Sequence, residues 1–260
     1  MDSSTHKFYH LHDFDSRQYL ENYVSNKDDM VFAEDSLLFP IENLTKTFAS
    51  GHIKGDILID LTMGSLVHHL YTACEFFKYI IVLKVSDRCI MELKRWVDTR
   101  TGAFDWSHAV KLHADIEGKS HPEQDKEDKV RATMQHVVKC NLQKENLTDP
   151  IVLPLADCLI SLWLLDVISK DKDDYIRYLK KCAKLLKPGG HLILIGDLDT
   201  TYITVGKHKV HYLTYNEEFA RNALAGEGFV IDCCKVKQRT VVSDLCDYKA
   251  VIFIVAHKNK

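Results

Sequence analysis

The sequence predicts an α/β protein with a mostly parallel sheet of seven strands, one antiparallel edge strand and helices on both faces. Apolar runs with the composition of buried strands alternate with amphipathic helical patterns from residue 55 onward. The last two apolar runs follow each other without a long helix between them, which favours an antiparallel partner at one edge. With 260 residues, 46% of them hydrophobic, the chain can bury the core of such a sheet.

We expect one domain over residues 1–260, in which an N-terminal helical cap (1–50) precedes the α/β core (55–260). No internal repeat and no low-complexity linker divides the chain. In the cap, Tyr19 and Tyr23 fall on one face of a short predicted helix, as residues that pack a helix face do.

Seven apolar runs are the candidate strands of the core, and their richness in Ile, Val and Leu is typical of strands that are buried on both faces. The runs are residues 56–61 (DILIDL), 79–85 (YIIVLKV), 109–114 (AVKLHA), 157–164 (DCLISLWL), 191–198 (HLILIGDL), 228–236 (GFVIDCCKV) and 249–257 (KAVIFIVAH). Helical patterns lie between most of them, at residues 66–77, 87–98, 127–140, 174–187 and 217–228.

Charge and composition exclude several classes of function. The formal net charge is -3 and no long basic stretch occurs, so the chain lacks the electrostatic signature of binding to nucleic acid or to an anionic membrane. The first residues do not resemble a secretory signal and no apolar run is long enough to span a bilayer, so we expect a cytoplasmic protein. We also expect a monomer. The eight cysteines form no CxxC pair and the histidines have no third ligand at metal spacing, so we expect free thiols and no metal site.

Ligands of open α/β sheets usually bind outside the carboxyl ends of the strands, where the strand order reverses. The loops to inspect are therefore residues 62–65 (TMGS), 84–87 (KVSD) and 163–166. A dinucleotide fingerprint would need three spaced glycines after the first strand, and only Gly64 is present. The sequence therefore disfavours a nicotinamide or flavin dehydrogenase.

Several segments together resemble one enzyme family. A Pro-Gly-Gly helix stop at 185–190 (LLKPGG) and a first strand that ends in Asp60 are typical of Class I S-adenosylmethionine-dependent methyltransferases, which have a Rossmann-like sheet. Over about residues 14–258, the chain is similar to the nicotinamide, indolethylamine and phenylethanolamine N-methyltransferase family. The matching segments are HDFDSRQYLENY (12–23), KGDILIDL (54–61), AFDWS (103–107), VVKCNL (137–142), LPLADCLIS (153–161) and LLKPGGHLIL (185–194).

The resemblance implies that S-adenosylmethionine binds across the strand ends and that a small amine or heteroaromatic nitrogen is methylated beneath the N-terminal lid. Catalysis in this family is mainly positioning and desolvation, so no catalytic acid or base is assigned. The family's cofactor positions fall on Tyr19, Tyr23, Thr62, Gly64, His68, Lys84, Cys89, Asn141 and Leu142. Its substrate positions fall on Asp197, Tyr202 and Tyr212.

The cofactor positions depart from the family pattern. Thr62 stands where the family has a glycine, so a branched Cβ would point into the cofactor's space. Lys84 replaces an acidic residue that accepts both ribose hydroxyls, and a lysine can only donate. Cys89 replaces an asparagine and His68 an aromatic residue, whereas Asn141 can still accept the hydrogen bond of the adenine amine. We expect cofactor binding to weaken or shift.

The substrate position at the end of the fifth strand also differs. The family has an acidic residue there, and this chain has Gly196 followed by Asp197. A shift by one residue turns a strand side chain to the other face, so Asp197 would replace the family carboxylate only if a bulge re-aims it. Tyr212 would narrow the pocket at a small polar contact. Nicotinamide is therefore disfavoured as a substrate.

Two hypotheses remain open. The first is an active N-methyltransferase, favoured by the family residues that persist: Tyr19, Tyr23, Gly64 and Asn141. The second is a non-catalytic descendant that keeps the fold as a binding or structural protein. It is favoured by the changed positions: Thr62, His68, Lys84, Cys89 and Gly196.

Overall fold

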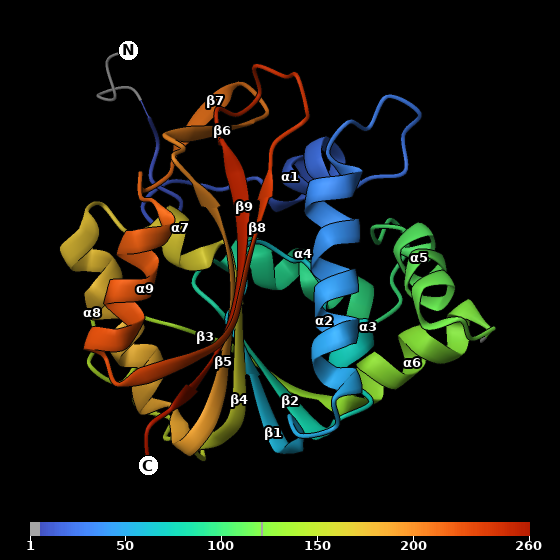
Figure 1. The fold of residues 1–260 in the computed structure, drawn as a ribbon. Coiled ribbons are helices and arrows are strands. Elements are labelled where there is room, and N and C mark those ends of the chain that lie inside the picture. Colours follow the sequence, from blue (N-terminus) through green and yellow to red (C-terminus); the bar gives the residue numbers. More distant parts are fainter. Residues whose placement is uncertain (1–5, 121) are drawn as a thin grey trace.

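A seven-stranded sheet forms the centre of the computed structural model, which describes residues 6–120 and 122–260. The strand order is β3-β2-β1-β4-β5-β9-β8, and helices cover both faces (Figure 1). The strands are β1 (Gly55–Asp60), β2 (Phe77–Lys84), β3 (Met134–Lys139), β4 (Ala156–Leu162), β5 (Leu186–Leu198), β8 (Phe229–Gln238) and β9 (Ala250–Lys258).

The pairing of the strands confirms the predicted fold class. Strands β1 to β5 run parallel to one another, and β9 runs antiparallel to both β5 and β8. The antiparallel strand therefore lies next to the edge strand β8. The order reverses between β1 and β4, and in open α/β sheets this is where the crevice for a ligand forms.

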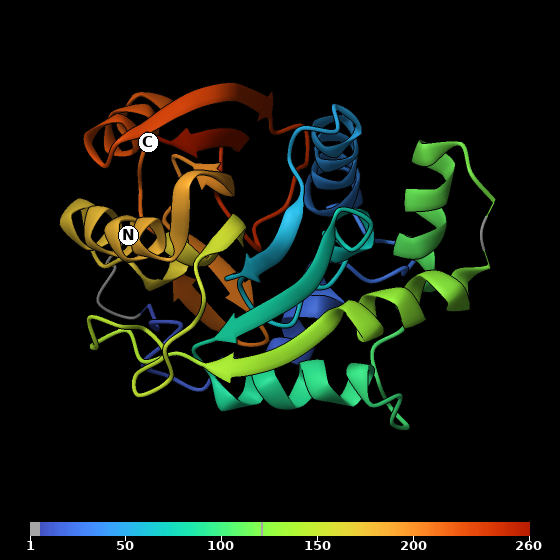
Figure 2. The ribbon, with the colours of Figure 1, turned by 90° about the horizontal axis from the view of Figure 1, so that it is seen from below.

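Helices on both faces explain why the central strands are continuous apolar runs. One face carries α7 (Leu164–Ile168), α8 (Lys172–Lys184) and α9 (Glu217–Gly226) (Figure 1). The other carries α2 (Phe39–Ala49), α3 (Leu70–Ala73), α5 (Ser107–Glu117) and α6 (Glu123–Thr133), as the view from below also shows (Figure 2). A π-helical turn, η2 (Glu34–Leu38), leads into α2, and α4 (Asp87–Val97) packs against β2 and β3.

One predicted strand was wrong. Residues 109–114 lie in α5, where the buried side chains are Ala109, Val110 and His113, which is helical spacing. A window of six residues fits both periods, so the apolar run alone did not distinguish them. The third strand is β3 instead, which the sequence pattern had included in the helix at 127–140; α6 ends at Thr133.

Residues 6–23 lie near the carboxyl ends of the parallel strands, at the top of Figure 1. Helix α1 (Ser16–Tyr23) begins after Asp15, whose carboxylate accepts the backbone N–H of Gln18. A small hairpin, β6 (Tyr202–Val205) and β7 (His208–His211), lies at the same end of the molecule (Figure 1). The hydroxyl of Tyr23 donates to the carbonyl of Thr204 at 2.7 Å and joins the helix to the hairpin.

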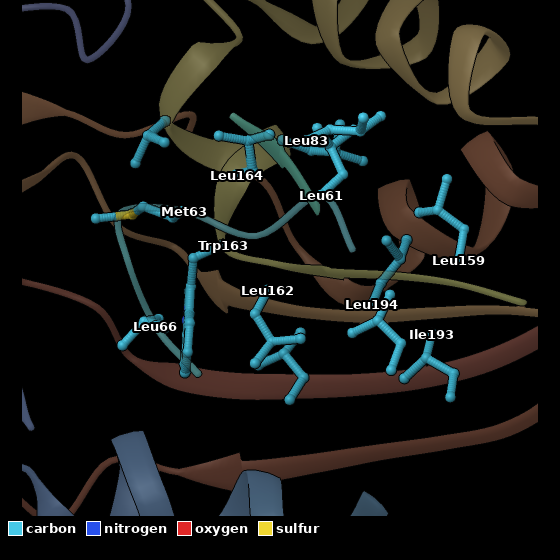
Figure 3. Packing of buried hydrophobic residues seen from close by; sticks show 14 of the residues in the cluster. Leu61, Met63, Leu66, Leu83, Leu159, Leu162, Trp163, Leu164, Ile193 and Leu194 are labelled. Carbon is cyan, nitrogen blue, oxygen red and sulfur yellow. The ribbon is translucent and has the colours of Figure 1, made fainter. Parts of the chain in front are cut away.

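The hydrophobic core continues beyond the strands into the loop after β1. All residues from 61 to 70 are buried. Figure 3 shows Met63 and Leu66 near Trp163 at one end of the view, with Leu159 and Ile193 at the other. The loop that should open onto a ligand is therefore packed as tightly as the sheet itself.

Candidate functional site

Thr62, in the loop after β1, is hydrogen-bonded to the ends of the neighbouring strands. Its hydroxyl donates to the Asp60 carboxylate at 2.6 Å and accepts the backbone N–H of Leu162 at 3.2 Å. The hydroxyl of Thr62 thus connects the ends of β1 and β4. Its side chain is 1% exposed, so its polar atom is satisfied inside the protein.

Lys84 ends β2 and lies across the strand ends. Its ammonium is buried and donates to the carbonyl of Thr62 at 2.9 Å. Burial lowers the pKa of Lys84, although the negative charge of Asp60 acts in the opposite direction. Burial alone would raise the pKa of Asp60, but the imidazole of His69 at 2.9 Å, together with Lys84 and Thr62, holds it below its usual value. Lys84, Asp60 and His69 form one buried cluster of ionisable side chains.

The space in front of Gly64 is filled by Tyr9, a residue that the sequence analysis missed. The Tyr9 hydroxyl accepts the backbone N–H of Gly64 at 2.8 Å and lies 3.3 Å from the sulfur of Cys89. The side chain is 2% exposed, and its ring centroid lies 4.5 Å from that of Phe14. Tyr9 lies outside any periodic pattern, so no sequence signal marked it.

Gly64 retains the backbone conformation that requires glycine, with a φ of +63°. A Cβ atom at this position would lie 3.6 Å from Cδ1 of Tyr19 and 3.7 Å from Cε1 of Phe14. These are ordinary contact distances, so the glycine is needed for its positive φ. The residues that face it come from the N-terminal cap.

His68 and Cys89 are both fully buried beside this loop. The His68 ring stacks on Trp106 with centroids 5.8 Å apart, and neither ring nitrogen has a hydrogen-bond partner among the residues that the structure describes. Burial lowers the pKa of His68 well below its ordinary value, so the ring is neutral. Burial also raises the pKa of the Cys89 thiol.

Asn141 and Leu142 lie at an open part of the same crevice. They line a hollow of about 440 Å³, whose other lining residues include Val85, His10 and Leu11. Asn141 is exposed, and its side-chain oxygen accepts the backbone N–H of Gln143. This part has room for a ring-sized ligand group, in contrast to the filled space at Gly64.

Asp197 lines a small cavity together with Tyr19, Tyr23 and Tyr212. The cavity has a volume of about 20 Å³, enough for about one water molecule. The indole N–H of Trp163 donates to the Asp197 carboxylate at 2.9 Å, and burial raises the pKa of Asp197 to about 7. Trp163 has a φ of +58°, which residues of this size rarely adopt.

No bulge is needed to bring Asp197 into this cavity. Strand β5 pairs with β9 in unbroken register from His191 to Leu198. Gly196 faces the other side, where a Cβ atom would collide with the Tyr215 hydroxyl and approach Asp166. In this part of the sheet, Asp197 is therefore the residue turned toward the N-terminal tyrosines.

Tyr202 is separate from the residues above. Its hydroxyl donates to the carbonyl of Asp244 at 3.0 Å, and the ammonium of Lys209 lies 3.9 Å from its ring centroid. It lines neither the hollow nor the cavity. The sequence-predicted residues thus fall into three groups at one end of the sheet, with Tyr202 outside them. The groups are Thr62, Gly64, His68, Lys84 and Cys89 at the loop; Asn141 and Leu142 at the hollow; and Tyr19, Tyr23, Asp197 and Tyr212 at the cavity.

The structure gives no support to a metal site or a membrane span. Over residues 6–120 and 122–260, no group of three or more His, Cys, Asp or Glu side chains could hold a metal ion. Within the same described ranges, no helix has the length and apolar character that crossing a bilayer requires.

Comparisons with known proteins give a consistent result. A family model described as the NNMT/PNMT/TEMT family matches residues 3–259. Human (Homo sapiens) nicotinamide N-methyltransferase is 33% identical over 254 residues, covering 98% of this chain and 96% of that protein. Rabbit (Oryctolagus cuniculus) indolethylamine N-methyltransferase is 34% identical, and the match covers 93% of this chain and 92% of that protein. Human phenylethanolamine N-methyltransferase is 32% identical, covering 94% and 89%.

Solved structures share the fold at much lower identity. Magnesium protoporphyrin IX methyltransferase from Synechocystis PCC 6803, solved with bound SAM, has a TM-score of 0.56 at 12% identity and covers 94% of this chain and 90% of that one. The N-methyltransferase NodS from Bradyrhizobium japonicum WM9, in complex with S-adenosylhomocysteine, has a TM-score of 0.51 at 12% identity and covers 95% and 100%.

Proposed function

The chain belongs to the NNMT/PNMT/TEMT family, and on that premise we propose that it is an S-adenosylmethionine-dependent N-methyltransferase of a small amine, with an altered donor site. The observation that carries the proposal is the contact between the loop after β1 and the Asp197 cavity. Tyr19 faces Gly64 and also lines the cavity, and the hydroxyl of Tyr212 lies 3.7 Å from the sulfur of Met63 in that loop. A donor at the loop and an acceptor at Asp197 would therefore be neighbours.

The residues at the strand ends fit one part of the donor. The hollow at Asn141 and Leu142 has the room and the polar edge that a nucleobase needs, with Val85 as an apolar wall. The space at Gly64 does not fit the amino-acid end of the donor in this conformation, because Tyr9 occupies it. When bound, the donor supplies an electrophilic methyl group; the chain contributes binding, orientation and exclusion of water.

The acceptor side combines a carboxylate with aromatic walls. Above about pH 7, Asp197 is deprotonated and can accept an N–H of an amine. The indole N–H of Trp163 donates to the same carboxylate and holds it in position. The side chains of Tyr19, Tyr23 and Tyr212 line the same cavity as this carboxylate, and aromatic faces attract a cationic group. Asp197 and Tyr212 thus orient the acceptor, and the cavity must widen to admit it.

A methyl-transfer assay tests this function. The protein is incubated with methyl-labelled S-adenosylmethionine and a panel of small primary and secondary amines, with nicotinamide as the neutral comparison. We expect transfer to at least one amine, and at least a tenfold loss of rate in Asp197→Asn, which keeps the size of the side chain and removes its charge. Donor binding without transfer to any acceptor would contradict the proposal.

A non-catalytic role is the second candidate, favoured by one specific observation. Two of the changed positions at the loop have partners inside the protein: Lys84 bonds to the carbonyl of Thr62, and Cys89 contacts Tyr9. A loop that is satisfied without a ligand needs none to be stable. Absence of any heat on titration with millimolar S-adenosylhomocysteine would favour this second function.

A further inference from the structure

We propose that residues 7–15 form an inhibitory strap, whose Tyr9 side chain occupies the donor's place at Gly64 and must withdraw before a methyl donor can bind. The identity of the excluded ligand rests on the proposed function. The strap itself rests on the contacts of Tyr9 alone. The two parts can therefore fail separately.

The position of the Tyr9 hydroxyl carries the first step. It lies between the backbone N–H of Gly64, in the loop after β1, and the sulfur of Cys89, in the helix after β2. The loop after β1 and the beginning of the helix after β2 border the place where open α/β sheets bind their ligands. The backbone N–H of such a loop is a donor that a ligand would use, and here Tyr9 already uses it.

The strap is fixed at both ends. On one side Lys7 pairs with β7, since its N–H donates to the carbonyl of Lys209 at 2.9 Å and its carbonyl accepts the N–H of His211 at 2.8 Å. On the other side the hydroxyls of Ser16 and Ser65 lie 2.6 Å apart. Between these anchors, residues 11–13 are exposed. Withdrawal of Tyr9 from Gly64 would therefore require a movement of the chain between these anchors.

The strap also separates the two parts of the crevice. Tyr9 points inward to Gly64, whereas the next two residues, His10 and Leu11, form a wall of the open hollow. A donor that spans both parts would have to displace this wall. Its apparent dissociation constant is then the intrinsic constant divided by the fraction of molecules in which the strap is open.

The first experiment measures the strap without any ligand. It compares Tyr9→Phe, which keeps the ring and removes the acceptor of the Gly64 N–H, with Tyr9→Ala and with Asp13→Ala, an exposed control on the same segment. We expect hydrogen exchange of the Gly64 amide to accelerate at least tenfold in Tyr9→Phe and more in Tyr9→Ala. Alkylation of Cys89, read by peptide mass spectrometry, should accelerate likewise in Tyr9→Ala. Asp13→Ala should match the wild type.

The second experiment measures competition. In calorimetric titrations with S-adenosylhomocysteine, we expect Tyr9→Ala to bind at least tenfold more tightly than the wild type, and Asp13→Ala within twofold of it. Exchange and labelling that do not change in either Tyr9 variant would overturn the strap, whatever the ligand does. Faster exchange with equal affinity in wild type and Tyr9→Ala would overturn the competition. Faster exchange with no binding in any protein would overturn the proposed donor, and the competition with it.

Discussion

The two parts of the strand-end crevice differ in how they are filled. Around Gly64 the side chains are buried, and the hydroxyl of Tyr9 accepts the backbone N–H of this glycine. Around Asn141 the surface is open, with a hollow of about 440 Å³. The family resemblance maps both parts to one cofactor site. The difference indicates that Thr62, Lys84 and Cys89 are part of the buried core, whereas the residues around Asn141 leave room for a ligand.

The largest effect is expected from a substitution that breaks the buried cluster of Asp60, Lys84 and His69. Asp60→Ala should lower the free energy of unfolding by about 3 to 5 kcal/mol, because it leaves Lys84 buried without its negative neighbour and His69 without its acceptor. Urea denaturation followed by circular dichroism measures this change. A loss below about 1 kcal/mol would show that the filled side is not part of the stabilising core.

The next prediction restores the family residues at the loop. The double substitution Thr62→Gly with Lys84→Asp should raise the affinity for S-adenosylhomocysteine at least tenfold, since two contacts of about 1 to 3 kcal/mol each are at stake. Lys94→Asp, on the exposed face of α4, makes the same change of charge away from the loop and should leave the affinity unchanged. Equal affinity in the double variant and the wild type would mean that residues other than Thr62 and Lys84 limit ligand binding, and Tyr9 would be the first to test.

A smaller effect concerns the cavity at Asp197. Trp163→Phe removes the N–H that bonds to the carboxylate, so the pKa of Asp197 should rise above about 7 by roughly one further unit, equivalent to about 1.4 kcal/mol. Carbon NMR of the Asp197 carboxyl group measures it.

The sign of the pH effect on stability follows from the same shift. The folded-state pKa of Asp197 exceeds that of an unfolded chain, near 4, so its contribution to stability is complete below about pH 4 and is lost as the pH rises to about 7. In Trp163→Phe, the loss of this contribution to stability should extend to higher pH. An unchanged carboxyl titration would mean that the indole does not hold this group.

The smallest effect is expected on the open side. Asn141→Ala should change the free energy of unfolding by less than about 1 kcal/mol, because the side chain is exposed and bonds only to a neighbouring backbone N–H. It should weaken binding of adenosine to the hollow by up to about tenfold, the value of one lost hydrogen bond. A thermal melt and an adenosine titration check the two parts. A large loss of stability would remove the contrast between the two sides.

The sequence predicted the sheet well where composition and order determine it. Long apolar runs such as β5 and β9 could be assigned from the letters alone, whereas residues 109–114 fit both a strand and a helix and were misassigned. At the site, the resemblance singled out Lys84 and Asp197, but their partners could not be read from it. Tyr9 reaches Gly64 across 55 positions of the chain, and such a contact follows from tertiary packing, which no local pattern encodes.

The orientation of Asp197 was also beyond the sequence. The alternation of side chains along a strand showed that Asp197 and Gly196 face opposite sides. Which side holds the cavity depends on where α1 and its tyrosines pack, and the structure places them on the side of Asp197.

Calorimetric titration of the unmodified protein with S-adenosylhomocysteine tests the central claim most directly. We predict measurable but weak binding, with a dissociation constant at or above about 100 µM, or about -5.5 kcal/mol, because the ligand must displace Tyr9 from Gly64. Binding at low micromolar concentration or tighter would contradict the account, because it requires that the space at Gly64 be open in the resting protein.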